Sequence, residues 1–379
     1  MELNTSIGLP SRSIMATPIV VPGSMPTMVY FRSVGECEYA IYLFIYVYNN
    51  ENKIDIIQGQ KIDSMSMELK QSSPQDCVGD FTYNFFWQHR GAKLNPTDPI
   101  PSQLDTSYSY EDVVETLKKG EDVHIKGDVG KRLGSSLGVD LVYFRGSGKE
   151  LPEVGSIIVD GNAGSYLGMS MLSGAIYVKG EVEEPVGNVI RVKTDLDGYK
   201  KFVSITWLLH HQKEIERESI LGPNELREDE LLLEDGILRS TVAARCRKAA
   251  KVHVKGDVGI SVGILMRKGF VLVDGDAGMN AAALLKGGKV VVLGDAAEFL
   301  GVAMRKGLVF VRGNCKGFVG AKISGGRIIC RRTKAVPPVK EKGLEKEDLA
   351  LLAEFGISGM ITLNYRRYEI ALERRNKER

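Results

Sequence analysis

The chain has 379 residues, of which 43% are hydrophobic and 26% are charged, and its formal net charge is +2. This composition is ordinary for a folded globular protein and excludes wholesale disorder. A charge so near zero gives no reason to expect a nucleic-acid or membrane-surface partner. Glycine is in excess, with 42 residues where about 7% of a chain is usual, and the glycines prove to be periodic.

The cysteines and the apolar runs indicate the cellular compartment in which the protein is expected. The five cysteines are odd in number and include no CxxC pair, which is typical of a reducing compartment and argues against a disulfide framework or a cysteine-built metal site. They are Cys37, Cys77, Cys246, Cys315 and Cys330. The longest apolar run, residues 40–48, is too short to span a bilayer as a helix. The first 25 residues do not have the pattern of a signal peptide. The sequence therefore predicts a cytoplasmic protein without a membrane partner.

Residues 1–108 form an N-terminal segment whose fold the sequence leaves unclear. Residues 39–48 and 53–58 are compatible with a hairpin about the turn at residues 49–52. A capped helix is predicted at residues 109–119, closed by Gly120, where it leads into the next region.

Residues 109–198 contain a first array of degenerate repeats. Residues 123–130 match residues 252–259 at seven of eight positions. Further rows begin at Val142, Ile157, Ile176 and Val189, with shortened coils. Residues 199–238 then form a linker in which apolar spacing predicts helices at 202–217 and 224–231. A third helix, at 240–248, is predicted to lead the second array.

Residues 239–332 form a second array, in which rows of 19 residues align column by column. One inward column is Val252, Val271, Val290 and Val309, and another is Val254, Val273, Val292 and Val311. The column after the first glycine of each row is Asp257, Asp276, Asp295 and Asn314. Residues 333–379 follow as a basic linker, a helix at about 345–355, a strand at 360–365 and a charged tail.

A 19-residue repeat of this kind favours one fold. The Val-x-Val alternation places both valines on one face of a strand, and a single such strand cannot bury that face alone. Stacked coils bury it by placing valine on valine. We therefore expect a mainly β protein, a right-handed parallel β-helix in two arrays with a helical linker and capping helices.

The unit Gly-Asp/Asn-x-Gly-x-x-x-Gly, present at residues 256–263 and 161–168, resembles the GXGXXXG β-helix family. That family includes the C-terminal domain of the glutamate synthase large subunit and the β-helix subunit of formylmethanofuran dehydrogenase. The repeat glycines that carry the resemblance are Gly127, Gly130, Gly134, Gly161, Gly164, Gly168, Gly256, Gly259, Gly263, Gly275, Gly278, Gly294 and Gly313.

The resemblance implies a non-catalytic structural subunit of a cytoplasmic oxidoreductase or amidotransferase complex, without a cofactor. Its partners would be catalytic subunits or a second copy of itself. The alternative is a catalytic or substrate-handling subunit with its chemistry in the N-terminal segment or the helical linker. Which complex the chain joins, and in what oligomeric state, stays open at this point.

Several local patterns suggest chemistry that the repeat explains better. Residues 259–263 spell GxSxG, but Ser261 shares its column with Asn280, Phe299 and Phe318, so we expect no nucleophile there. The recurring glycines are not followed by the long helix of a dinucleotide site. Adjacent histidines such as His210 and His211 point about 100° apart on a helix and are poorly placed to bind one metal. We expect no catalytic, cofactor-binding or metal-binding residues.

The residues between the inward valines form an outward column that is unusually apolar. Leu272, Val291 and Phe310 make up this candidate docking stripe, which continues from His253 to Ile329. Large exposed apolar patches are uncommon, so we expect something to cover it. The candidates are the linker helix, the C-terminal helix, the other array, a partner subunit or a second copy of the chain.

Overall fold

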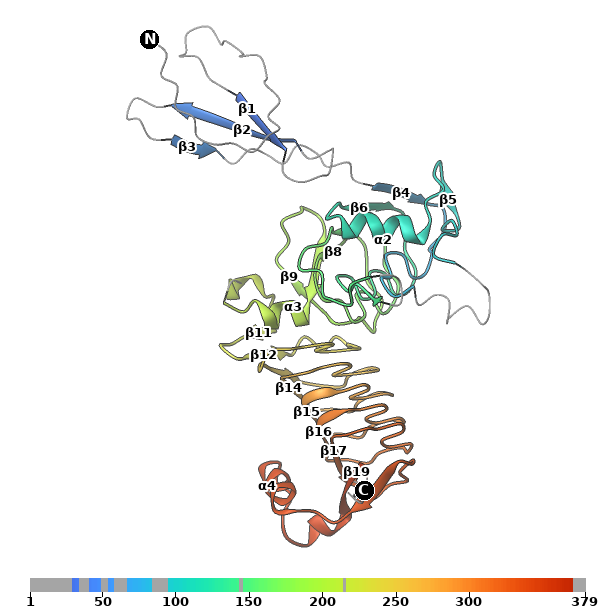
Figure 1. Ribbon diagram of the computed structural model, residues 1–379, viewed down its shortest axis with the longest axis vertical. Helices are drawn as coiled ribbons and strands as arrows, with labels where there is room; N and C mark the ends of the chain where they lie inside the picture. Colours follow the sequence, from blue (N-terminus) through green and yellow to red (C-terminus); the bar gives the residue numbers. More distant parts are fainter. Residues whose placement is uncertain are drawn as a thin grey trace, which may run out of the picture. The chain divides into compact units, whose positions relative to one another are not determined.

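The computed structural model describes residues 29–33, 41–48, 54–57, 67–83, 95–142, 146–213 and 216–370 (Figure 1). The chain divides into two units, Met1–Ser66 and Met67–Arg379. In the first unit, β1 (Val29–Ser33), β2 (Ile41–Tyr48) and β3 (Ile54–Ile57) form an antiparallel sheet in that order. The pairing of β2 with β3 confirms the predicted hairpin, whose turn at residues 49–52 lies outside the described residues.

The second unit is a parallel β-solenoid with few helices, as the repeat predicts. Its strands are β4 (Met67–Gln71), β5 (Gln103–Leu104), β6 (Val123–Lys126), β7 (Ile157–Val159), β8 (Ala175–Val178), β9 (Val189–Val192), β10 (Lys200–Ser204), β11 (Glu225–Leu226), β12 (Glu230–Leu233), β13 (Lys251–Val254), β14 (Phe270–Val273), β15 (Lys286–Val292), β16 (Lys306–Val311), β17 (Arg327–Arg331), β18 (Val339–Lys342) and β19 (Tyr365–Ile370). Its helices are α2 (Tyr110–Lys118), α3 (Ile205–His210), α4 (Lys346–Glu354) and the short 3-10 helices η2 (Arg217–Ser219) and η3 (Gly359–Asn364).

The two valine columns form the core ladder of the second array. Val271 pairs with Val252 on one side and with Val290 on the other, and the same register continues through β16 to β17. Val273 and Val292 of the second column have no exposed surface. The predicted alignment of the 19-residue rows is therefore confirmed.

The two arrays stack end to end in one solenoid. A second ladder of single-residue bridges runs along another side of the coil, and it crosses from Val186 of the first array to Arg239 and on to Val258. The ladder then continues through Ala277, Ala296 and Cys315. The last turn of the first array is thus hydrogen-bonded to the first turn of the second.

At this junction the predicted linker helices are largely wrong. Residues 200–204 form β10, which lies between β8 and β9 and is antiparallel to both, so that among the described residues 202–213 those of α3 alone are helical. Ser204 caps α3 by accepting a hydrogen bond from the N–H of Trp207. Residues 225–233 form β11 and β12, and β12 pairs in parallel with β13. The apolar residues whose spacing suggested amphipathic helices are buried here in the interior of the solenoid.

The segment predicted as the leading helix of the second array, residues 240–248, consists of turns. Thr241, Ala243 and Arg245 each have a positive φ, and the residues between them do not. This alternation recurs in the next turn at Ser261, Gly263 and Leu265. Val242 and Cys246 are nevertheless buried, because this alternating backbone also directs some of its side chains into the core.

One turn of the solenoid has no counterpart in the sequence prediction. β4 pairs in parallel with β6, and Met67 and Leu69 lie beside Val123 and Ile125. Gln71 and Ser72 stand at the positions equivalent to the Gly-Asp pair at residues 127–128, so this turn does not show the repeat pattern in the sequence. Residues 143–145 of the row predicted at Val142 lie outside the described residues; Val142 itself is 69% exposed, and the ladder passes directly from β6 to β7.

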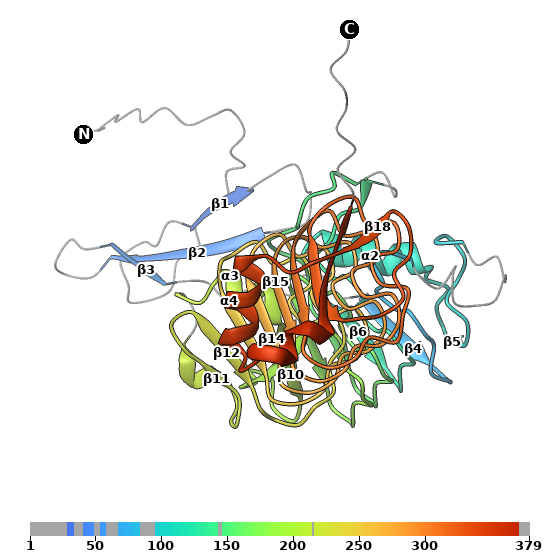
Figure 2. The ribbon, with the colours of Figure 1, turned by 90° about the horizontal axis from the view of Figure 1, so that it is seen from below.

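The ends of the solenoid are closed by antiparallel strands. β5 pairs with β4 at one end, and β19 with β18 follows β17 at the other. The predicted helices at both ends are present as α2, with Ser109 in a capping box, and as α4. The predicted strand at 360–365 is wrong, because η3 occupies these residues and the strand begins only at Tyr365. Figure 2 looks along the stack and shows α4 over the strand face that carries β14 and β15.

Candidate functional site

The Gly-Asp pair of each turn serves to join that turn to the next. The backbone N–H of Asp276 donates to Oδ1 of Asp257 at 2.7 Å, and the bond recurs at the same distance between the following turns. A Cβ on Gly275 would lie 2.1 Å from that carboxylate oxygen. The equivalent distances at Gly294 and Gly313 are 2.2 and 2.3 Å. Glycine is required because the carboxylate of the preceding turn occupies the place of a side chain.

Ser261 occupies a structural position that recurs in every turn of the second array. Its φ of +61° matches those of Asn280, Phe299 and Phe318, which are +61°, +64° and +53°. Ser261 is buried, with 7% of its surface exposed. Its place in the coil is thus one that phenylalanine fills as well as serine does.

The histidines and cysteines of the second array are engaged in local contacts. Nε2 of His253 lies 2.8 Å from Oδ1 of Asp274, and its Nδ1 lies 3.5 Å from Oε1 of Glu230. The hydrogen bond with Cys315, together with burial, raises the pKa of the Cys330 thiol well above its usual value. That shift disfavours the reactive thiolate. Within the described ranges, no group of three or more His, Cys, Asp or Glu side chains could hold a metal ion.

The candidate docking stripe lies under the C-terminal helix. Val291 and Phe310 are fully buried in a cluster with Leu351 and Leu352 of α4. The ring of Phe310 lies 5.4 Å, centre to centre, from that of Phe355. Leu272 is half-buried at the edge of the cluster. Of the covers that the sequence leaves open, the one present over Val291 and Phe310 is the chain's own C-terminal segment.

A buried ion pair fixes this helix against the solenoid. Asp348 of α4 is fully buried, and its Oδ1 accepts a hydrogen bond from Nη1 of Arg327 at 2.8 Å. Nη1 of Arg367, on β19, lies 3.5 Å from the other oxygen of the same carboxylate. Because a buried charge is tolerated only when it is paired and hydrogen-bonded, this arrangement gives α4 one defined seat.

Beyond this helix, η3 carries an exposed apolar surface that we call the cap patch. It consists of Met360, Ile361 and Leu363, which are 84%, 55% and 68% exposed. Single exposed apolar residues are ordinary, whereas three within one short helix at the end of a solenoid form a local apolar surface. The sequence interpretation placed these residues in a strand, although their apolar run was visible.

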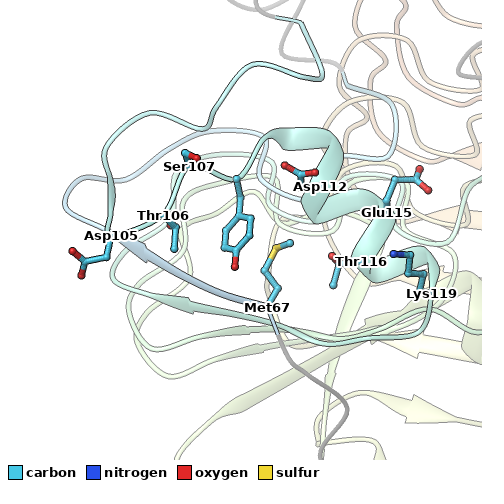
Figure 3. A pocket seen from close by; sticks show the side chains of 9 residues that line it. Met67, Asp105, Thr106, Ser107, Asp112, Glu115, Thr116 and Lys119 are labelled. Atoms are coloured by element: carbon cyan, nitrogen blue, oxygen red, sulfur yellow. The ribbon is translucent and has the colours of Figure 1, made fainter. Parts of the chain in front are cut away.

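A second surface feature is an open hollow of about 560 Å3 beside α2. Figure 3 shows Asp112 and Glu115 on α2 and, from the loop before the helix, Asp105, Thr106 and Ser107. The carboxylate of Asp112 accepts hydrogen bonds from both the N–H and the hydroxyl of Ser109, so this group serves the helix cap. The loop lies in the N-terminal segment where the enzymatic alternative places its chemistry.

None of the helices among the described residues is long and apolar enough to cross a membrane. No family model matches the sequence. One chain of the formyltransferase/hydrolase complex FhcABCD from Methylorubrum extorquens, solved with methylofuran, aligns over 80% of this chain and 94% of its own length. The identity is 15% and the TM-score 0.26, a likeness that carries no argument about function.

A curated relative covers most of the chain. It comes from Methanothermobacter thermautotrophicus (strain Delta H), where it has the name "Uncharacterized protein", and it is 52% identical over 291 residues. The alignment covers 77% of this chain and 92% of the relative. This chain therefore belongs to the same protein family as that protein of M. thermautotrophicus.

Proposed function

We propose that this protein is a non-catalytic structural subunit that organises a larger assembly of oxidoreductase or amidotransferase type. The proposal draws on the resemblance of the repeat to the GXGXXXG β-helices of glutamate synthase and formylmethanofuran dehydrogenase. In keeping with it, the Gly-Asp pairs join one turn to the next, and Ser261 occupies a purely repeating position.

The observation that carries the proposal is the cap patch. The nearby edge strand β18 presents exposed Lys340 and Glu341 to solvent, which is a usual way to prevent another strand from pairing with an edge. By contrast, η3 presents Met360, Ile361 and Leu363. An apolar surface next to a charged edge is suited to a specific protein partner, whose core contacts exclude water while charged residues surround them.

Isolation of the assembled complex tests this role. The tagged full-length chain is purified from the cells that make it, as wild type and as the triple variant Met360→Ser, Ile361→Ser, Leu363→Ser. We expect the wild type to be isolated at fixed stoichiometry with subunits that carry the catalytic activity, and the triple variant to be isolated without them. The matched control is the double variant Leu104→Ser, Val142→Ser, which removes exposed apolar side chains elsewhere and should leave the complex intact.

Two results would contradict the proposal. One is an unchanged complex with the triple variant, at equal melting temperatures. The other is substrate turnover by the isolated, monomeric wild-type chain, which would favour the enzymatic alternative and direct attention to the hollow beside α2. Light scattering of the purified chain distinguishes a partner subunit from a second copy, because only self-association changes its mass in the absence of other proteins.

A further inference from the structure

Four cationic residues occupy the same corner on four consecutive turns of the second array. The N–H groups of Arg267, Lys286 and Arg305 donate to the carbonyls of Cys246, Met266 and Leu285, each one turn earlier. Arg247 follows Cys246 and so begins the column. Adjacent strands lie about 4.8 Å apart, and like charges at that spacing repel one another. The corresponding corner of the first array carries Gly138 and Leu172, so the cations are not required by the coil.

At the junction of the two arrays, three of these four cations line a small pocket, and Arg305 does not. Its walls are formed by Val139, Gly148, Lys149 and Glu150 from the first array and by Arg245, Arg247, Leu265, Arg267 and Lys286 from the second. Glu150 lies 3.1 Å from Arg247. Five cationic side chains thus share one carboxylate, which leaves four positive charges without a counter-charge among the lining residues.

Arg245 is the residue that makes this pocket unusual. In the following turns its column holds Leu265, Leu284 and Ala303, all with positive φ as in Arg245 itself. Nε of Arg245 is buried and has no hydrogen-bond partner among the described residues. A buried donor without an acceptor is unfavourable, and an apolar residue would fill the same position without that penalty.

The neighbouring cations also make the charged form of Arg245 less favourable. Burial lowers the pKa of Arg245, Glu150 opposes that shift, and Arg247 and Arg267 lower the pKa further. Burial also lowers the pKa of Lys286, and the charges of Arg267 and Arg305 add to this. The cluster is therefore electrostatically strained, and a bound anion would relieve the repulsion.

We propose that this pocket binds a phosphate-class oxyanion, either free or as the terminal group of a small phosphorylated molecule. The pocket holds about 30 Å3, and one water needs about 10–15 Å3 of such space, so there is room for two or three oxygens of one oxyanion and not for a whole metabolite. Guanidinium groups present fixed pairs of donors that match phosphate oxygens. A dianionic phosphoryl group neutralises two of the four excess charges, whereas a carboxylate neutralises one. The site does not depend on the proposed structural role.

Titration of the full-length chain with inorganic phosphate, followed by calorimetry and thermal unfolding, tests the proposal. The test variant is Arg245→Leu, because leucine already occupies this column in the next two turns. The matched control is Lys322→Leu, which also replaces a cation by leucine in the same column, where Lys322 has φ +56° and does not line the pocket. We expect phosphate to raise the melting temperature of the wild type and of Lys322→Leu. In Arg245→Leu we expect the affinity to fall at least tenfold, with an equal or higher melting temperature in phosphate-free chloride buffer.

A second variant, Arg267→Gln, keeps the test valid if Arg245→Leu folds poorly, because Arg267 is exposed; it too should weaken phosphate binding. Glycerol 3-phosphate distinguishes the sources: tighter binding than phosphate indicates a phosphorylated molecule, and equal binding indicates the free ion. Acetate should bind at least tenfold more weakly than phosphate. Equal binding of acetate and phosphate by the wild type, or phosphate affinity unchanged in both variants, overturns the proposal.

Discussion

Asp295 donates its backbone N–H to Oδ1 of Asp276, one turn earlier in the solenoid, at 2.7 Å. The preceding residue, Gly294, donates its own N–H to the carbonyl of Gly275 at 3.0 Å. The pairs at residues 275–276, 294–295 and 313–314 therefore each make two bonds to the turn before. The aspartate supplies the acceptor, and the glycine leaves room for it.

Gly294→Ala is expected to destabilise the solenoid. Its Cβ would lie 2.2 Å from Oδ1 of Asp276 and 2.6 Å from the backbone of Gly275, and relieving such a clash typically costs about 1–3 kcal/mol. The measurement is the free energy of unfolding in urea. Gly343→Ala is the control, because a Cβ there meets nothing within 4 Å. Equal stabilities of the two variants would contradict the role assigned to the Gly-Asp pair.

Val292→Asp is expected to prevent or strongly weaken folding of the second array. Val292 has no exposed surface and pairs with Val273 and Val311 in the core ladder, so an aspartate there would be a buried charge without a partner. We expect a loss of several kcal/mol, seen as a lower melting temperature or an insoluble protein. Val142→Asp, at a position 69% exposed, should be nearly neutral. A soluble Val292→Asp variant that melts like the wild type would refute the inward assignment.

The double variant Leu272→Ser, Phe310→Ser is expected to release α4. Phe310 is fully buried and packs against Phe355 and Tyr365, and truncating a buried phenylalanine costs about 3–5 kcal/mol. Hydrogen exchange at residues 346–354 should become faster, and the melting temperature should fall. Phe318→Ser, at a residue 48% exposed, is the control. If exchange in α4 did not change, something other than this contact would hold the helix.

Stability is expected to fall as the pH is lowered from about 6.5 to 4, in part because of His210. Nε2 of His210 accepts a hydrogen bond from the N–H of Arg247 at 3.0 Å, which requires a neutral ring. Burial, followed by the charges of His211, Lys248 and Arg247, lowers the pKa of His210 from 6.5 to about 4. The unfolded chain therefore takes up this proton at a higher pH than the folded chain does, and the stabilising contribution is complete only above 6.5.

Urea unfolding at pH 7.5, 5.5 and 4.5 measures this effect. His210→Gln keeps a hydrogen-bonding side chain but does not titrate, so its stability should fall less steeply over the same window. The carboxyl groups that also titrate near pH 4 are common to both proteins and cancel in the comparison. Parallel pH profiles would show that His210 does not contribute.

The repeating part of the fold follows from the amino-acid sequence alone. Each turn contacts chiefly its two neighbours, so a 19-residue period fixes which residues lie side by side, and the register of Val271 between Val252 and Val290 could be predicted without a structure. The local capping signal at Ser109 was also sufficient for α2, because a capping box depends on residues three apart, whereas the similar signal at Ser240 did not give a helix. The sequence also indicated that the apolar stripe had to be covered.

The secondary structure and the contacts of the non-repeating segments are decided by the tertiary structure. The apolar spacing of residues 202–217 is compatible with a helix, yet residues 200–204 became β10 because β8 and β9 offered strand edges on both sides. The stripe is covered by α4, and Arg247 meets Glu150 almost a hundred residues away in the chain. Such contacts join segments that share no period, and the energy that selects them comes from burial and charge pairing between distant residues. The spacing of residues along the chain gives no information about these contacts, so the cap patch and the cationic pocket could be recognised only in the folded structure.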